Sequence, residues 1–231
     1  MKKKGSTLSE LLLYSVLLML VLSVAYTFFR LAQGYVHKTR AQVELQQNVG
    51  LAGASLVRDL SEAWSDAVTS FPNASAPSAP AGVVFLMARD SQNRFVYEVA
   101  SGYPIWQRYV GYFLDADPLN PAQRALYRAE VVDRGGLPTV NPQSPLEAGV
   151  TTAWLRDHGV NRKLIAAGFR PESPAAPHGG LDLYSLASDS TTHLYSERLT
   201  MPVWVDLELL NPSTGSSENS LRSRLSVLAR N

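Results

Sequence analysis

Residue types that perform catalysis are present in this chain of 231 residues, but their spacing matches no catalytic or metal-binding motif. The four histidines lie far apart and no His-Glu-x-x-His sequence occurs, so a zinc hydrolase is not indicated. Ser55 lies in Gly-Ala-Ser-Leu-Val rather than Gly-x-Ser-x-Gly, and no phosphate-binding glycine loop is present. The absence of cysteine excludes thiolate nucleophiles, thiolate metal sites and disulfides. We therefore expect no enzymatic activity, no bound metal and no cofactor.

One stretch has oxygen ligands at a spacing that suits calcium. Asp115, Asp117 and Asn120 supply two carboxylates and an amide within six residues. The glycine and glutamate that complete an EF-hand loop do not follow. A plain turn is the favoured interpretation, and cation binding by these three residues is left open.

The other notable residue is Glu10, a carboxylate at the start of a long apolar run. Leu11–Phe29 contains no charged side chain. As a helix this run would span roughly 28 Å, close to the hydrocarbon thickness of a bilayer. A carboxylate next to the membrane core requires a partner, because an unpaired charge is costly there. Thr7 and Glu10 have the spacing of a capping box, which offers a local partner.

Lys2–Lys4 precede the apolar run, as in a secretory signal peptide or a signal anchor. The run is longer than the apolar region of an ordinary signal peptide, and no small-residue cleavage site follows it. A signal anchor fits the length of the run but does not explain Glu10.

The lysine-rich leader, Gly5, the sequence Ser-Thr-Leu-Ser-Glu and the long apolar helix resemble the class III signal of type IV pilins and type II secretion pseudopilins. The sequence from Leu45 to Leu60 further resembles the helices of minor pilin W and minor pseudopilin J. Two positions depart from the usual pattern of the signal: Ser6 stands where phenylalanine is common, and Ser9 stands where isoleucine is common.

The resemblance implies that a prepilin peptidase cleaves between Gly5 and Ser6 and methylates the new amine of Ser6. Glu10 becomes the fifth residue of the mature chain, which is the acidic position of the family. It would pair with the Ser6 amine of a neighbouring subunit and so bring the two subunits into register. A carboxylate near a helix start also interacts favourably with the helix dipole.

Net charge argues against nucleic acid as a partner. The chain has 21 basic and 20 acidic residues, and cleavage after Gly5 would remove three lysines. The mature chain then has 18 basic residues against 20 acidic ones, a net charge of about −2 before the termini are counted. Phosphate binding normally needs a basic patch. The partners that the resemblance implies are other pilin or pseudopilin subunits, the prepilin peptidase and inner-membrane lipid.

Hydrophobic periodicity extends the helix beyond the apolar run, to about Asp66. Apolar residues recur at spacings of three and four and form one stripe: Leu45, Val49, Ala52, Leu56, Leu60, Ala63 and Trp64. The expected fold is α+β and pilin-like, with a long N-terminal helix, half transmembrane and half amphipathic, packed on an antiparallel sheet. The expected segments are a leader (1–5), a transmembrane half-helix (6–34), an amphipathic half-helix (35–69), a linker (70–82) and a β-rich periplasmic or extracellular domain (83–231).

Strands are predicted where apolar and polar residues alternate. They lie at 83–88, 95–100, 108–114, 124–132, 203–209 and 221–229, with a further candidate at 181–186. The first two are expected to form a hairpin, as are the last pair at 203–209 and 221–229, which would place Asp206 and Glu208 near Arg222 and Arg224. Short helices are predicted at 146–157 and 162–167. Tyr103 is expected in an aromatic sheet core with Trp106, Tyr109, Tyr112 and Phe113.

The leading functional hypothesis is a minor pilin or pseudopilin, a structural subunit that starts assembly or sits at the tip of a type IV pilus or secretion pseudopilus. Before assembly it would span the inner membrane once, with the lysines in the cytoplasm by the positive-inside rule and the C-terminal domain in the periplasm. It would then join a surface pilus or a periplasmic pseudopilus. The alternatives are a pilus-associated binding subunit, for adhesion, DNA uptake or a secretion substrate, and an anchored periplasmic enzyme.

Overall fold

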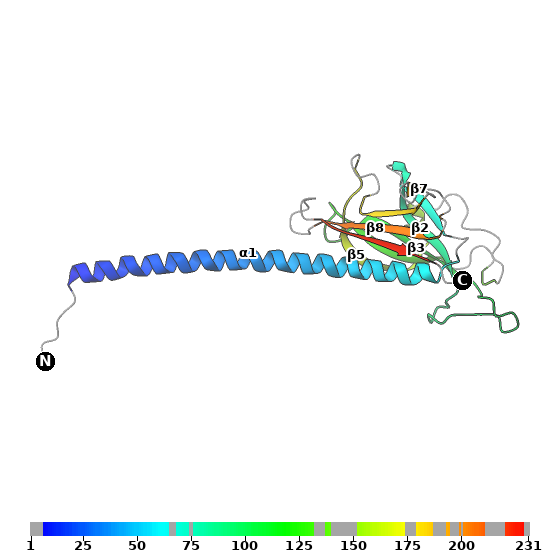
Figure 1. The fold of residues 1–231 in the computed structure, drawn as a ribbon, viewed down its shortest axis with the longest axis horizontal. Coiled ribbons are helices and arrows are strands. Elements are labelled where there is room, and N and C mark those ends of the chain that lie inside the picture. The colour runs from blue at the N-terminus through cyan, green and yellow to red at the C-terminus, as the bar shows by residue number, and fades with distance from the viewer. Residues whose placement is uncertain are drawn as a thin grey trace. The chain divides into compact units, whose positions relative to one another are not determined.

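The structure is a computed structural model. It describes residues 7–64, 68–73, 76–131, 137–139, 152–173, 179–186, 193–194, 199, 201–210 and 220–228. The chain divides into two compact units, Met1–Val43 and Glu44–Asn231. A single helix, α1 (Leu8–Ser61), begins in the first unit and ends in the second (Figure 1).

The second unit is α+β, as predicted. After α1, the described residues form nine strands and one short helix: β1 (Thr69–Asn73), β2 (Ala76–Met87), β3 (Arg108–Ala116), β4 (Arg124–Val131), α2 (Thr152–His158), β5 (Val160–Phe169), β6 (Leu181–Leu186), β7 (His193–Leu194), β8 (Val203–Leu209) and β9 (Leu221–Val227). Every strand pair is antiparallel. The strand order is β1-β2-β3-β4-β5-β8-β6-β7, with β9 added to β8.

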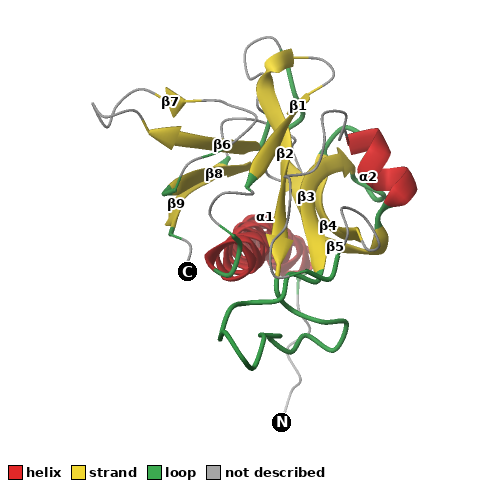
Figure 2. Ribbon diagram, turned by 90° about the vertical axis from the view of Figure 1, so that its right-hand side faces the viewer, coloured by secondary structure: helices red, strands yellow, loops and turns green. Residues whose placement is uncertain are grey.

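The sheet curves around the C-terminal part of α1, which Figure 2 shows end-on. The predicted stripe from Leu45 to Ala63 is buried, and Ala52, Leu56 and Leu60 are fully enclosed. It packs on one face of the sheet, against side chains that include Phe85, Tyr112 and Leu207. Burial of this stripe removes a large apolar surface from water, and each buried leucine contributes roughly 1.5–3 kcal/mol.

The opposite face of β2, β3 and β4 is also covered. Phe113, Tyr127 and Leu155 belong to a second apolar cluster on that face. Leu155 comes from α2 and packs directly on the backbone of β3, because a Cβ at Gly111 would lie 3.0 Å from both of its methyl groups. Strands β3 and β4 are therefore buried on both faces.

The strands predicted at 108–114, 124–132, 181–186, 203–209 and 221–229 are confirmed in place, with small differences at their ends. The β8–β9 pairing is confirmed in register, with Asp206 opposite Arg224 and Glu208 opposite Arg222. Both pairs form ion pairs, at 2.8 and 3.2 Å.

The end of the helix and the linker were predicted wrongly. The helix ends at Ser61 rather than near Asp66, because the chain turns into the sheet where Ala63 pairs with Met87. Residues 70–82 are not a linker, since most of them form the β1–β2 hairpin. Proline is tolerated at a sheet edge and at bulges, and Pro72 pairs with Pro80 at a shift of register.

Three further predictions were wrong. Residues 95–100 do not pair with β2, which instead pairs with β1 and β3. Residues 162–167 are not helical, because they form part of β5 and pair with β4. Tyr103 is 65% exposed and lies outside the core, whereas the other four residues of the predicted aromatic cluster are buried. Of the helix predicted at 146–157, the described part begins at Thr152, and residues 146–151 lie outside the described residues.

Candidate assembly site at the start of the helix

Glu10 lies in the first turn of α1 and closes a capping box with Thr7. The Thr7 N–H donates to Glu10 Oε2 at 2.9 Å, and the Glu10 N–H donates to Thr7 Oγ1 at 3.4 Å. These bonds satisfy two of the backbone donors that every helix start leaves without an intrahelical partner. The capping box that the sequence offered as a local partner for Glu10 is therefore formed in the isolated chain.

The capping box occupies only one oxygen of the carboxylate. Among the described residues, Glu10 Oε1 has no hydrogen-bond partner and no cation contacts Glu10. Gly5 and Ser6 lie outside the described residues, so the cleavage and the amine that it would create stay predictions. The free oxygen is the chemical group that a cation from another molecule would bind.

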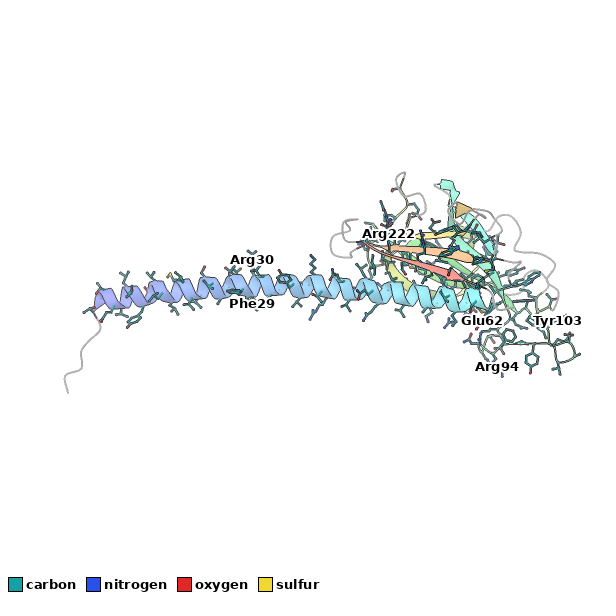
Figure 3. All side chains as sticks on the ribbon, viewed as in Figure 1. Phe29, Arg30, Glu62, Arg94, Tyr103 and Arg222 are labelled. Atoms are coloured by element: carbon teal, nitrogen blue, oxygen red, sulfur yellow. The ribbon has the colours of Figure 1, made fainter. Side chains whose placement is uncertain are left out.

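The helix behind Glu10 is long and apolar enough to cross a membrane. Its most apolar window has a mean hydropathy of 2.3, and no residue of that window is buried within the chain. Side chains such as Phe29 project outward and Arg30 follows the apolar run (Figure 3). This segment is consistent with a membrane anchor or a signal.

No protein-family model, no curated protein and no solved structure matches this chain. The architecture is pilin-like, and the fold and site geometry alone support the interpretation that follows.

A buried ion network at the other end of α1 was missed by the sequence analysis. Asp59 Oδ2 accepts hydrogen bonds from Tyr112 Oη and Arg128 Nε, both at 2.8 Å. Arg128 Nη1 also donates to Glu130 Oε1 at 2.6 Å. Arg108 Nη1 donates to Glu130 Oε2 at 2.8 Å. Arg58 Nε, on the largely exposed side of the network, also donates to Asp59 Oδ1 at 2.9 Å. Two carboxylates and three guanidinium groups thus join the helix to β3 and β4.

Burial and charge both shift pKa values in this network. Burial raises the pKa of Tyr112, and the neighbouring Asp59 carboxylate raises it further, so the phenol stays protonated. Burial also raises the pKa of Glu130, but hydrogen bonds from Arg128 and Asn161 and the two guanidinium charges outweigh it. The net effect lowers the Glu130 pKa, and the carboxylate is ionised at neutral pH.

One signal in the sequence could have indicated this network. Asp59 lies seven residues after Ala52 and three after Leu56, so it falls on the apolar stripe that the helix buries. An acid on a buried stripe requires a partner, because an unpaired buried charge is strongly destabilising. The sequence did not show that the partner would be Arg128, which is 69 residues away.

Asp115, the first of the three residues considered as calcium ligands, is already paired with arginine side chains. Both oxygens of Asp115 accept hydrogen bonds from Arg156, and Arg162 donates to Oδ2 at 2.9 Å. Asp117 and Asn120 each accept a backbone N–H two residues ahead, which is turn geometry. The described residues contain no cluster of three or more potential metal ligands of the His, Asp and Glu types. The plain turn is the interpretation that this geometry favours.

Proposed function

We propose that this chain is a structural subunit of a pilin-like filament, a minor pilin or pseudopilin that enters the assembly from the inner membrane. The observation that carries the proposal is the composition of α1. Leu11–Phe29 is uncharged, apolar and exposed in the isolated chain, whereas the last turns of α1 bury an apolar stripe under the sheet. A lipid bilayer before assembly, and apolar helices of other subunits afterwards, would cover Leu11–Phe29. This role requires no catalytic group.

Glu10 is the proposed contact between subunits. Its Oε2 closes the helix start within its own chain. Its Oε1, which has no partner among the described residues, would accept the cationic amine that prepilin peptidase would create at Ser6 of a neighbour. A carboxylate among apolar helices is tolerated when a cation neutralises it. This pairing would fix the axial position of one subunit against the next, at assembly initiation or at the filament tip.

Processing is tested by co-expression with a prepilin peptidase and measurement of the intact mass. The expected mature chain begins at Ser6 and carries one methyl group. A chain that keeps its leader, or one that begins elsewhere, would refute the processing.

The pairing role is tested by separating the charge of Glu10 from its capping bond. Glu10→Gln retains an oxygen that accepts the Thr7 N–H but removes the charge, whereas Thr7→Ala removes the hydroxyl cap and keeps the charge. We expect Glu10→Gln to lower the incorporation of the subunit into filaments at least tenfold, and Thr7→Ala to leave it nearly unchanged. The opposite result would show that Glu10 acts only as a cap. Incorporation is measured by immunoblotting of sheared filaments against the cellular pool.

A further inference from the structure

Residues 89–107 form an ordered loop that leaves the sheet between β2 and β3. Arg89 forms a bidentate ion pair with Glu62, the residue that follows the end of α1. Figure 3 labels Glu62 at this junction and Arg94 and Tyr103 on the loop. Isolated bridges join Arg89 to Phe95 and Tyr97 to Pro104, so the loop is a small hydrogen-bonded ribbon.

The central segment of this loop, residues 94–98, uses only one of its two backbone edges. Val96 donates to the Ala88 carbonyl and accepts from the Ile105 N–H, and Glu98 donates to the Tyr103 carbonyl. In an antiparallel ribbon the intervening residues direct their backbone groups to the other edge. Within the described part of the chain, the N–H and C=O groups of Phe95 and Tyr97 make no hydrogen bond.

The free edge is also apolar. Phe95, Tyr97 and Val99 alternate along the segment and are 48%, 58% and 91% exposed. Proteins usually protect such edges with lysine, proline or a bulge. None of the three alternate positions on this edge carries a charge or a proline.

The two cations beside the edge are already paired within the chain. Arg94 pairs with Asp90 at 3.0 Å and Arg89 pairs with Glu62, whereas Glu98 accepts a hydrogen bond from Ser101 and keeps its negative charge. The loop therefore offers no unpaired cation, among its described residues, to a nucleic acid or an anionic lipid. Unpaired backbone groups, alternating apolar side chains and the absence of a free cation match an uncharged, extended polypeptide.

We propose that the Phe95–Val99 edge binds an extended, uncharged strand of another protein chain by β-strand addition. Backbone hydrogen bonds to Phe95 and Tyr97 supply affinity, and contacts with the three alternating apolar side chains supply selectivity. This interaction is separate from the helix contact at Glu10.

The probe is a fluorescent peptide, Thr-Val-Thr-Val-Thr-Val-Thr with blocked ends, titrated against the full chain in zwitterionic lipid nanodiscs. The matched control peptide is N-methylated at every residue and cannot form the ladder. We expect saturable binding of the first peptide, measured by fluorescence anisotropy, and at least tenfold weaker binding of the second. Equal binding of both peptides, binding to empty nanodiscs alone, or no binding would overturn the proposal.

Variants locate the binding edge. Tyr97→Pro removes one outward N–H and none of the hydrogen bonds that hold the loop together, and it should weaken binding at least tenfold. Leu119→Ser, at an equally apolar exposed residue in the β3–β4 turn, should leave the affinity unchanged. Equal affinity of Tyr97→Pro and the unmodified chain would refute the assignment.

Hydrogen exchange on the unmodified chain provides a test that does not depend on the folding of a variant. On addition of the peptide, the amides of Phe95 and Tyr97 should exchange at least tenfold more slowly, whereas the Glu98 amide, which is already bonded, should change little. Unchanged exchange at Phe95 and Tyr97 would overturn strand addition. Failure of the Glu10 experiment would leave this result intact, because the two sites share no residue.

Discussion

At the scale of single residues, the ion network around Asp59 joins the end of α1 to the sheet. Asp59, Glu130 and Arg108 are 3%, 5% and 6% exposed, so their charges are largely removed from water. Desolvation of two acids and two bases is costly, and their mutual pairing offsets that cost only while every partner is present. The network therefore favours one placement of the helix end against β3 and β4.

Removal of Arg128 should destabilise the second unit strongly. Arg128→Ala removes the guanidinium group that Asp59 and Glu130 share. Asp59 keeps Arg58 and Tyr112, and Glu130 keeps Arg108 and Asn161, so we expect a cost of about 1.5–3 kcal/mol of unfolding free energy. Tyr112→Phe removes one hydrogen bond to Asp59 and should cost about 1 kcal/mol. Urea denaturation followed by tryptophan fluorescence measures both. Arg224→Ala breaks an exposed Arg–Asp pair of the same length and should leave the midpoint unchanged.

The lowered pKa of Glu130 predicts the direction of the acid response. A carboxyl group whose pKa is lower in the folded than in the unfolded state contributes stability above its unfolded value, about 4.3. That contribution is lost as the pH falls through the lower folded value. The free energy of unfolding should therefore decrease below about pH 4.3, and Glu130→Gln should show a shallower decrease. Glu44→Gln, on the exposed side of α1, serves as the control.

At the scale of elements, the alternation of apolar and polar residues identified strands that have one buried face and one more exposed face. β8 was predicted correctly because it alternates buried Val203, Val205 and Leu207 with half-buried neighbours. The hairpin at 95–100 was predicted wrongly for the same reason. Phe95, Tyr97 and Val99 alternate like a buried face, but they lie in a loop outside the sheet and are exposed. Periodicity predicts extended backbone but does not say which partner covers it.

The packing of α1 against β9 predicts opposite effects at two nearby glycines. A Cβ at Gly50 meets nothing within 4 Å, whereas one at Gly53 would lie 2.9 Å from Leu225 Cδ1. Gly50→Leu should stabilise the second unit by about 0.5–1 kcal/mol through helix propensity. Gly53→Leu should destabilise it by about 1–3 kcal/mol through overpacking. Thermal unfolding measured by circular dichroism gives the midpoint of each variant. A shift of both midpoints in the same direction would contradict the close contact between Gly53 and Leu225.

At the scale of the whole molecule, the two units differ in how much of their apolar surface is buried within the chain. The second unit buries its stripe and both faces of β3 and β4 within itself. The described part of the first unit leaves large apolar side chains such as Leu17, Leu20 and Phe29 exposed. Exposed apolar surface of that extent requires lipid or other helices as a partner. This segment is consistent with a membrane anchor or a signal.

Membrane insertion is tested with charges placed in the apolar run. Leu17→Arg combined with Leu20→Arg should reduce the membrane fraction after carbonate extraction, because each arginine near the centre of a span costs about 2.5–3.5 kcal/mol on insertion scales. The matched control, Gln46→Arg combined with Gln47→Arg, places the same charges on the exposed side of α1 in the second unit. An equal membrane fraction in both double variants would contradict a transmembrane role for Leu11–Phe29.

The sequence by itself determined the features that depend on neighbouring residues. The apolar run, the Thr7–Glu10 cap, the stripe from Leu45 to Leu60 and the β8–β9 pair all follow from spacing within a short window. Only the tertiary structure decided that Asp59 meets Arg128 and that Thr69–Asn73 pairs with the first part of Ala76–Met87. It also decided that the backbone groups of Phe95 and Tyr97 have no partner among the described residues. These features depend on which distant segments pair, and pairing is set by competition among strands that local periodicity does not distinguish.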